Sequence, residues 1–139
     1  MPIKNYTTKV PADRSINEIQ TALVSRGAVG ILYEYEKGTG RIAALKFRLP
    51  MKEQIVSFAL PVNWRKFQRV LQLQNVSRSK DEDHVYRVAW RVIRDWVLAQ
   101  LAIHETEMVD LPQLFLPYAM NGQGTTLYET INDGKFLLN

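Results

Sequence analysis

The sequence predicts an α+β fold, in which helices pack on an antiparallel sheet of three to four strands. Two alternating segments flank a Lys-Gly-Thr-Gly turn and a third follows, which is typical of an antiparallel meander. Apolar residues at helical spacing occur before and after this region in the sequence. The longest such pattern predicts one long central helix in the C-terminal half of the chain. With 139 residues, 46% hydrophobic and 23% charged, the chain is expected to form a single domain, residues 1–139.

The first segment is expected to contain a short edge strand and then a helix. Residues 6–10, Tyr-Thr-Thr-Lys-Val, favour a strand, and Pro11 ends it. Ser15 and Glu18 have the spacing of a capping box, and Gly27 fits the position that follows a last helical turn. Between them, apolar residues recur at helical spacing: Ile16, Ile19, Ala22 and Leu23.

Three strands are expected next, at residues 28–36, 41–49 and 53–60. The glycines of residues 37–40 suit a hairpin turn between the first two strands. In the second strand, alternate residues are apolar and are expected to share one face: Ala43, Leu45, Phe47 and Leu49.

Two helices follow the sheet. Asn63 is expected to cap the first, at residues 64–74, and the acidic residues Asp81, Glu82 and Asp83 favour the start of the second, which is expected to run from about 83 to about 108. The apolar residues of the long helix cover most of its circumference. Its main apolar face is Val85, Val88, Ala89, Val92, Ile93, Trp96, Ala99 and Ile103, widened by Trp90, Val97 and Leu101. A single sheet covers only one side of such a helix, so we expect a homo-oligomer.

The last part of the chain is expected to be less regular. Asp110 fits the N-cap of a short helix that has Pro112 in its first turn. Residues 121–124, Asn-Gly-Gln-Gly, favour a flexible loop, and residues 125–131 fit either a strand or a helical turn. The apolar tail at residues 135–139 is a possible docking segment for a partner.

Composition excludes several classes of site. The chain has no cysteine, so disulfides and thiolate metal sites are excluded. The first ten residues lack the apolar core of a signal peptide, and no run approaches the roughly 20 apolar residues of a membrane span. We therefore expect a cytoplasmic protein without membrane contact.

Catalytic, metal and phosphate-loop motifs are incomplete. The His-Glu-Thr-Glu-Met segment at His104 lacks the second histidine of a zinc-protease motif, and no serine lies in a Gly-x-Ser-x-Gly context. The two glycine-containing loops, at residues 37–41 and 121–126, lack the spacing of a phosphate-binding P-loop. The sequence therefore predicts no metal, no cofactor and no enzymatic activity.

Three parts of the sequence carry a resemblance to known proteins. These are the block at residues 6–28, the Phe-Ala-Leu-Pro-Val-Asn segment at 58–63, and residues 87–129, within which Arg87–Leu101 and Phe115–Tyr118 are the most specific. Together they resemble a set of short hypothetical proteins encoded in bacteriophage and prophage regions, to which no activity is assigned. The resemblance implies a viral or mobile-element setting, and hence the broad themes of replication, recombination or counter-defence.

Positive charge is concentrated in residues 64–94. This span holds eight basic and three acidic residues and carries +5, whereas the net charge of the whole chain is +4. A charge concentrated in one segment favours an anionic partner. The candidate nucleic-acid or anion-binding residues are Arg65, Lys66, Arg69, Arg78, Lys80, Arg87, Arg91 and Arg94.

The arrangement of these cations allows two interpretations. At 100° per residue, Arg87, Arg91 and Arg94 lie within about 60° on one side of the long helix, and Arg91 is spaced for an ion pair with Asp95. If the two helices pack side by side, this row and the row formed by Arg65 and Arg69 merge into one phosphate-binding surface. Otherwise the arginines form only a solvated margin.

Two functional hypotheses follow. The first is a small phage-type protein that binds nucleic acid without sequence specificity, through this basic helical surface. The alternative is a counter-defence protein that sequesters a host protein or an anionic nucleotide signal.

Overall fold

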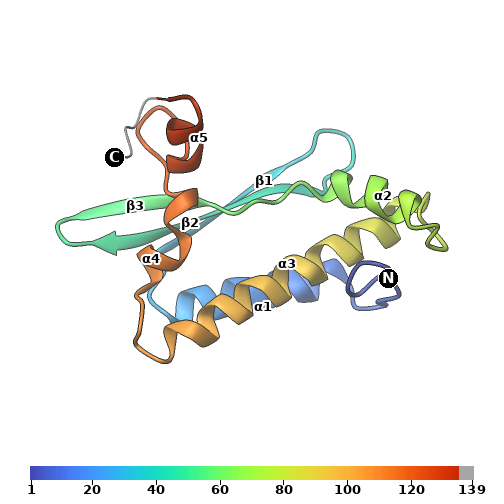
Figure 1. Cartoon of the computed structure of the whole chain (residues 1–139), viewed down its shortest axis with the longest axis horizontal. Coiled ribbons are helices and arrows are strands. Elements are labelled where there is room, and N and C mark those ends of the chain that lie inside the picture. Colours follow the sequence, from blue (N-terminus) through green and yellow to red (C-terminus); the bar gives the residue numbers. More distant parts are fainter. Residues whose placement is uncertain (135–139) are drawn as a thin grey trace. The chain divides into compact units, whose positions relative to one another are not determined.

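The computed structural model describes residues 1–134, so the possible docking tail at 135–139 lies outside the described residues. The order of elements is α1 (Ala12–Ser25), β1 (Gly30–Tyr35), β2 (Ile42–Met51), β3 (Gln54–Ala59), α2 (Trp64–Leu73), α3 (Glu82–His104), α4 (Leu111–Phe115), the 3-10 helix η1 (Leu116–Tyr118) and α5 (Leu127–Asn132) (Figure 1). The predicted α+β fold class, with its antiparallel sheet and one long helix, is confirmed.

The chain divides into two compact units. Unit 1 consists of Met1–Ala22 and Val62–Ala102, and therefore contains most of α1, all of α2 and most of α3. Unit 2 consists of Leu23–Pro61 and Ile103–Asn139, and contains the sheet, α4, η1 and α5.

The sheet of unit 2 is an antiparallel meander with the strand order β1-β2-β3. Phe47 of β2 pairs with Ile31 of β1 and with Phe58 of β3, so the alternation in the sequence sets the register. The side chains of Leu45, Phe47 and Leu49 are buried, which confirms the predicted apolar face. The ring of Phe47 stacks on Phe58 at 5.3 Å and meets the edge of Phe115 at 5.2 Å, so α4 packs on this face (Figure 1).

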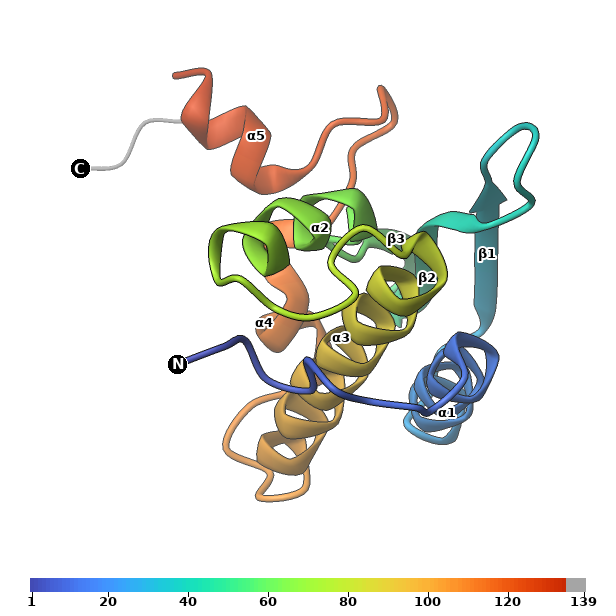
Figure 2. The ribbon, with the colours of Figure 1, turned by 90° about the vertical axis from the view of Figure 1, so that its right-hand side faces the viewer.

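Unit 1 is built around α3. The side chains of Ser15 and Glu18 on α1 contact Arg91 and Arg94 on α3 in the same order, so α1 and α3 run parallel, side by side (Figure 1). Helix α2 packs on another side of α3, as Figure 2 shows. One buried apolar cluster joins α2, the turn after it and α3: Trp64, Leu71, Val76, Val85, Val88 and Ala89.

Residues 6–10 do not form a strand, so the prediction of an edge strand there is wrong. Asn5 has a φ of 65° and its carbonyl accepts a hydrogen bond from the Thr8 N–H at 2.9 Å, so the chain turns here. The Tyr6 carbonyl lies 2.8 Å from Nε2 of the buried His84. Because this carbonyl is occupied by a side chain of α3, a strong β propensity does not produce a strand.

The predicted N-cap of α1 is also wrong, whereas its predicted end is confirmed. Helix α1 begins at Ala12, because the Pro11 carbonyl accepts from the N–H groups of Arg14 and Ser15, at 3.1 and 3.3 Å. Ser15 is therefore inside the helix and fully buried. At the other end, Gly27 has a φ of 113° and the Ala28 N–H bonds the Leu23 carbonyl at 3.0 Å, which is the Schellman arrangement.

The ends of α2 and α3 differ in detail from the expectation. Asn63 precedes α2 but makes no side-chain capping bond. The acidic start of α3 is confirmed, because Asp81 Oδ1 accepts from the N–H groups of Asp83 and His84 at 3.1 and 3.3 Å. Helix α3 ends at His104, a turn before the expected position, and Glu107 then has a φ of 63°.

The short C-terminal helices are capped by their sequence motifs. Asp110 and Gln113 form a capping box at α4, as the position of Asp110 predicts. The undecided segment 125–131 is helical over most of its length, because Thr126 and Glu129 form a second capping box at α5.

The burial of α3 bears on the expected homo-oligomer. Trp90, Val97 and Leu101 are 0%, 0% and 2% exposed in the single chain. The apolar surface that motivates an oligomer is therefore covered within the chain, and the oligomer stays a prediction without that support. Within residues 1–134, no helix combines the length and the apolarity that crossing a membrane requires.

Candidate nucleic-acid interface

Two of the eight candidate cations lie in an ion-pair network between α1 and α3. Glu18 Oε2 accepts from Arg94 Nε at 2.6 Å and from Arg91 Nη1 at 3.1 Å. Arg94 also pairs with Asp95 at 2.9 Å, and Arg91 Nη1 lies 3.4 Å from Ser15 Oγ. The ion pair expected between Arg91 and Asp95 is therefore replaced by pairs with other partners.

The charges of this network stabilise one another. Burial alone raises the pKa of Asp95, but hydrogen bonds from Asn5, Arg94 and Lys4 outweigh it and lower the pKa to about 2. Burial likewise raises the pKa of Glu18, but Arg94 and Arg91 lower it below its ordinary value. The side chains of Arg91 and Arg94 are only 18% and 26% exposed. We infer that both arginines hold α1 against α3 and contribute little to an external surface.

Two further candidates form exposed pairs. Arg65 Nη1 lies 3.1 Å from Glu82 Oε2, and its guanidinium lies 4.3 Å from the centre of the Trp64 ring. Arg78 pairs with Asp81 at 2.6 Å. Exposed ion pairs contribute at most about 1 kcal/mol. A phosphate group can therefore replace either carboxylate at small cost.

Three candidates are exposed cations with no acidic partner in the described part of the chain. Lys66 and Arg69 lie on the solvent side of α2, and Lys80 lies in the turn between α2 and α3. Helix α2 contains no acidic residue at all. Gln68 Nε2 donates to the Ser79 carbonyl at 3.3 Å, so this turn is held against α2.

Arg87 differs from the other seven candidates. It is half-buried, its Nε has no hydrogen-bond partner, and its guanidinium makes no ion pair with any residue in 1–134. It borders a cavity of about 350 Å³ that is lined by other residues of unit 1.

The two basic rows do not form one surface. Arg91 and Arg94 face α1, whereas α2 packs on Val85, Val88 and Ala89, which lie on a different side of α3 (Figure 2). The candidates divide accordingly into three sets. The α2 cations, as we call them, are Arg65, Lys66, Arg69, Arg78 and Lys80; the network arginines are Arg91 and Arg94; and Arg87 stands alone.

The charge of the two units differs in sign. Unit 1 contains eleven Lys and Arg and six Asp and Glu, which gives +5. Unit 2 contains seven basic and eight acidic residues, which gives −1. The net charge of unit 1 therefore favours an anionic partner, and that of unit 2 does not.

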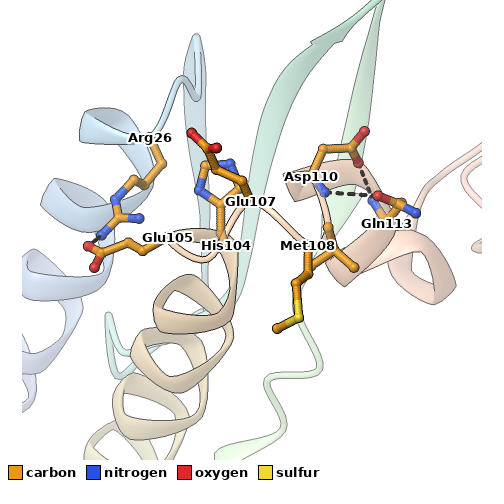
Figure 3. A pocket seen from close by; sticks show the side chains of 8 residues that line it. Arg26, His104, Glu105, Glu107, Met108, Asp110 and Gln113 are labelled. Atoms are coloured by element: carbon orange, nitrogen blue, oxygen red, sulfur yellow. Dashed lines mark hydrogen bonds and ion pairs between the residues drawn. The ribbon is translucent and has the colours of Figure 1, made fainter.

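Unit 2 contains a separate cavity of about 470 Å³ beside the end of α3 (Figure 3). Arg26 and Glu105 form an ion pair at its rim, and Asp110 and Gln113 form the α4 capping box across from them (Figure 3). His104 has a buried Nδ1 without a partner among the described residues.

The chemistry of this second cavity is limited. It has no nucleophilic hydroxyl or thiol among its lining residues, and residues 1–134 contain no group of three His, Cys, Asp or Glu side chains that could hold a metal ion. We infer no reaction from it.

Sequence reasoning identified the cations but missed their partners. Glu18 reads in the sequence as part of a capping box, and Ser15 as its N-cap. Both instead contact Arg91, which lies 73 positions from Glu18 and 76 positions from Ser15. No local pattern reports contacts over such separations.

Comparison of the chain with protein-family models, curated proteins and solved structures gives no match. The resemblance to phage-encoded proteins therefore stays a prediction, and the function has to be argued from the site.

Proposed function

We propose that the protein binds nucleic acid without reading its sequence, through phosphate contacts made by the α2 cations. The observation that carries the proposal is the set of Lys66, Arg69 and Lys80, which are exposed and lack an acidic partner in residues 1–134. Cations without internal partners are free to neutralise phosphates, and they release condensed counterions from the nucleic acid when they do.

Arg65 and Arg78 extend this surface. Their pairs with Glu82 and Asp81 are exposed, with side-chain exposures of 47% and 54% for the two arginines. Because these pairs contribute little, both arginines can exchange a carboxylate for a phosphate. The guanidinium of Arg65 also lies over the ring of Trp64, and this cation–π contact restricts its position.

The number of phosphate contacts sets the salt dependence of binding. Three to five contacts correspond to a slope of log K against log salt of about −2 to −3.5 on single strands and about −3 to −4.5 on duplex DNA. Base-specific contacts are not part of the proposal, so affinity is expected to vary little among oligonucleotides of equal length and different sequence.

The test is a fluorescence-anisotropy titration of labelled oligonucleotides at several salt concentrations. The wild type is compared with the double variant Lys66→Glu/Arg69→Glu. Removing two contacts lowers the magnitude of the slope by about 1.4 on single strands or about 1.8 on duplex.

A charge-matched control separates a site from a net-charge effect. Lys37→Glu/Lys52→Glu changes the charge by the same amount at two exposed lysines of unit 2. The proposal expects this control to bind nearly as the wild type does. Equal loss in both double variants, or no binding by the wild type at low salt, would overturn it.

A specific observation favours part of the alternative, in which the protein sequesters an anionic nucleotide. This is the cavity beside the unpaired Arg87 in unit 1. A phage or prophage setting and a cytoplasmic location belong to both proposals, because the nucleic acids and nucleotides of a host are found there.

A further inference from the structure

The cavity beside Arg87 is shaped like a small-ligand site. It has a volume of about 350 Å³ and lies between the segment before α1 and the first turns of α3, all within unit 1. Volumes of this order are typical of sites for small ligands. Its chemically informative lining residues are Lys9, Asp13, Asp83, Tyr86 and Arg87.

Arg87 is the main reason to expect a ligand in this cavity, because its charge has no partner among the described residues. Its Nε is buried without a hydrogen-bond partner, and none of the described residues forms an ion pair with its guanidinium. An unsatisfied buried donor on a charged group is costly, and proteins seldom leave one without a role. The Nε itself is closed off from the cavity, so a phosphate or carboxylate there would pair with the terminal nitrogens of the guanidinium, which has no ion-pair partner among the described residues.

Opposite charges border the same cavity without pairing. Lys9 and Asp13 are both exposed, and neither makes a hydrogen bond or ion pair within residues 1–134. Asp83 also borders the cavity. A simple anion such as phosphate would satisfy only Arg87 and Lys9 and would be repelled by the two carboxylates. The lining therefore suits a ligand that carries both an anionic group and N–H donors.

Tyr86 supplies an aromatic wall. Its ring makes T-shaped contacts with the rings of Trp64 and Trp90, at centroid distances of 5.2 and 6.4 Å, and these contacts restrict its orientation. A fixed aromatic ring is a stacking platform for a nucleobase. The cavity also borders the start of α1, and the N-terminal end of a helix favours an anion.

We propose that this cavity binds one nucleotide, either free or as a residue of a bound strand. The phosphate contacts Arg87 and Lys9, the face of the base lies against Tyr86, and the N–H edge of the base faces Asp13. Where the nucleotide belongs to a strand, this inference rests on the proposed nucleic-acid function; for a free nucleotide it stands alone.

The chemistry of Asp13 also selects among bases. An ionised carboxylate only accepts hydrogen bonds, and its two oxygens match two adjacent N–H donors. Guanine presents such a pair on its Watson–Crick edge, whereas adenine and cytosine present a single amino group there. We therefore expect guanosine 5′-monophosphate to bind more tightly than adenosine 5′-monophosphate.

The test is calorimetric titration of the full chain with guanosine monophosphate, adenosine monophosphate, guanosine and inorganic phosphate. Arg87→Gln removes the charge and is expected to weaken binding of the guanine nucleotide at least about tenfold. Lys9→Gln, at an exposed position without an internal partner in residues 1–134, weakens it less. Asp13→Asn reduces the preference for guanine over adenine. Lys37→Gln, at an exposed lysine of unit 2, removes one positive charge as Arg87→Gln and Lys9→Gln do, and is the matched control that leaves nucleotide binding unchanged.

The outcomes separate this inference from the proposed function. Nucleotide binding that Arg87→Gln and Lys9→Gln weaken supports it, whether or not oligonucleotides bind. Absence of nucleotide binding, together with oligonucleotide binding that Arg87→Gln and Lys9→Gln leave unchanged, overturns it and leaves the proposed function intact. Inorganic phosphate that binds as tightly as the nucleotide, or an unchanged affinity in the Lys9→Gln and Arg87→Gln variants, also overturns it.

Discussion

Glu18 of α1 accepts a hydrogen bond from Arg94 of α3 at 2.6 Å, across 76 positions of sequence. The same carboxylate pairs with Arg91 at 3.1 Å and with Arg14 at 3.3 Å. One acidic side chain thus pairs with arginines from two helices, and no other ionised group of α1 forms an ion pair with α3 among the described residues.

The first prediction concerns this carboxylate. Glu18→Gln removes the charge that Arg91 and Arg94 share, so we expect the free energy of unfolding to fall by about 1–3 kcal/mol. Urea denaturation midpoints measure the change. The control is Glu53→Gln, at an exposed glutamate between β2 and β3, which is expected to change stability by less than about 0.5 kcal/mol. Equal effects of the two substitutions would show that the network does not stabilise the helices.

The second prediction concerns acid stability. The folded-state pKa of Asp95 is about 2, below the ordinary value of 3.8. A carboxyl whose pKa is lower in the folded state stabilises the protein above its unfolded pKa, and this stability is lost as pH falls through the folded pKa. Asp95 therefore contributes roughly 2 kcal/mol that disappears between about pH 4 and about pH 2.

Urea midpoints measured at successive pH values test this contribution. In the wild type, the free energy of unfolding is expected to fall steeply over that window, and Asp95→Asn is expected to flatten the fall. Glu18, Asp81 and Glu129 also have lowered pKa values, so some slope remains in the variant. An identical slope with and without Asp95 would contradict the prediction.

The fold was largely predictable from the sequence, because most of its signals are local. The alternation in residues 41–49 and the turn glycines predict β1, β2 and their hairpin, and both describe neighbours in sequence. The failure at residues 6–10 has a different origin. There the structure depends on His84, whose ring forms a hydrogen bond with the Tyr6 carbonyl although the two residues lie 78 positions apart in the sequence.

The candidate site was predictable only as a list of charges. Arg65, Lys66 and Arg69 can be read as a cationic helix surface, because α2 contains no acid. Arg91 looks equally cationic in the sequence, yet Glu18 neutralises it in the structure. Whether an arginine faces solvent or a carboxylate depends on which helices pack together, and the sequence pattern does not contain that information.

The third prediction compares two tryptophans of α3. The sequence places Trp96 on the main apolar face of the long helix and Trp90 beside that face, but in the structure Trp90 is 0% exposed and Trp96 is only partly buried. Trp90→Ala is expected to cost about 3–5 kcal/mol, because it leaves a large cavity. Trp96→Ala is expected to cost about 1 kcal/mol. Thermal or urea unfolding gives both values, and a larger cost at Trp96 would reverse the assignment.

The fourth prediction concerns the end of α1. Gly27 has a φ of 113°, and an added Cβ would meet no atom within 4 Å, so only the backbone conformation disfavours a side chain. Gly27→Ala is expected to lower the free energy of unfolding by about 1–2 kcal/mol. Gly122→Ala is the control, because that glycine also has open space and does not have a positive φ. Comparable losses in both variants would contradict the role of Gly27 as a helix stop.

The last prediction distinguishes the network arginines from the α2 cations. The free energy of unfolding and the salt slope of oligonucleotide binding are measured on the same variants. The network arginines contact Glu18 and are mostly covered, whereas Lys66 and Arg69 are exposed and have no partner in residues 1–134. Arg91→Gln/Arg94→Gln is therefore expected to lower the free energy of unfolding by about 1–3 kcal/mol while the salt slope of oligonucleotide binding stays unchanged.

Lys66→Gln/Arg69→Gln is expected to do the opposite, because it removes two phosphate contacts and no internal bond. The magnitude of its salt slope falls by about 1.4 on single strands. Its free energy of unfolding changes by less than about 0.5 kcal/mol. Both variants remove two positive charges, so net charge cannot explain a difference between them. If the network pair also reduces the slope, Arg91 and Arg94 exchange Glu18 for phosphate on binding, and the interface includes the α1 side of α3. If neither pair changes the slope, the α2 cations are not the binding surface.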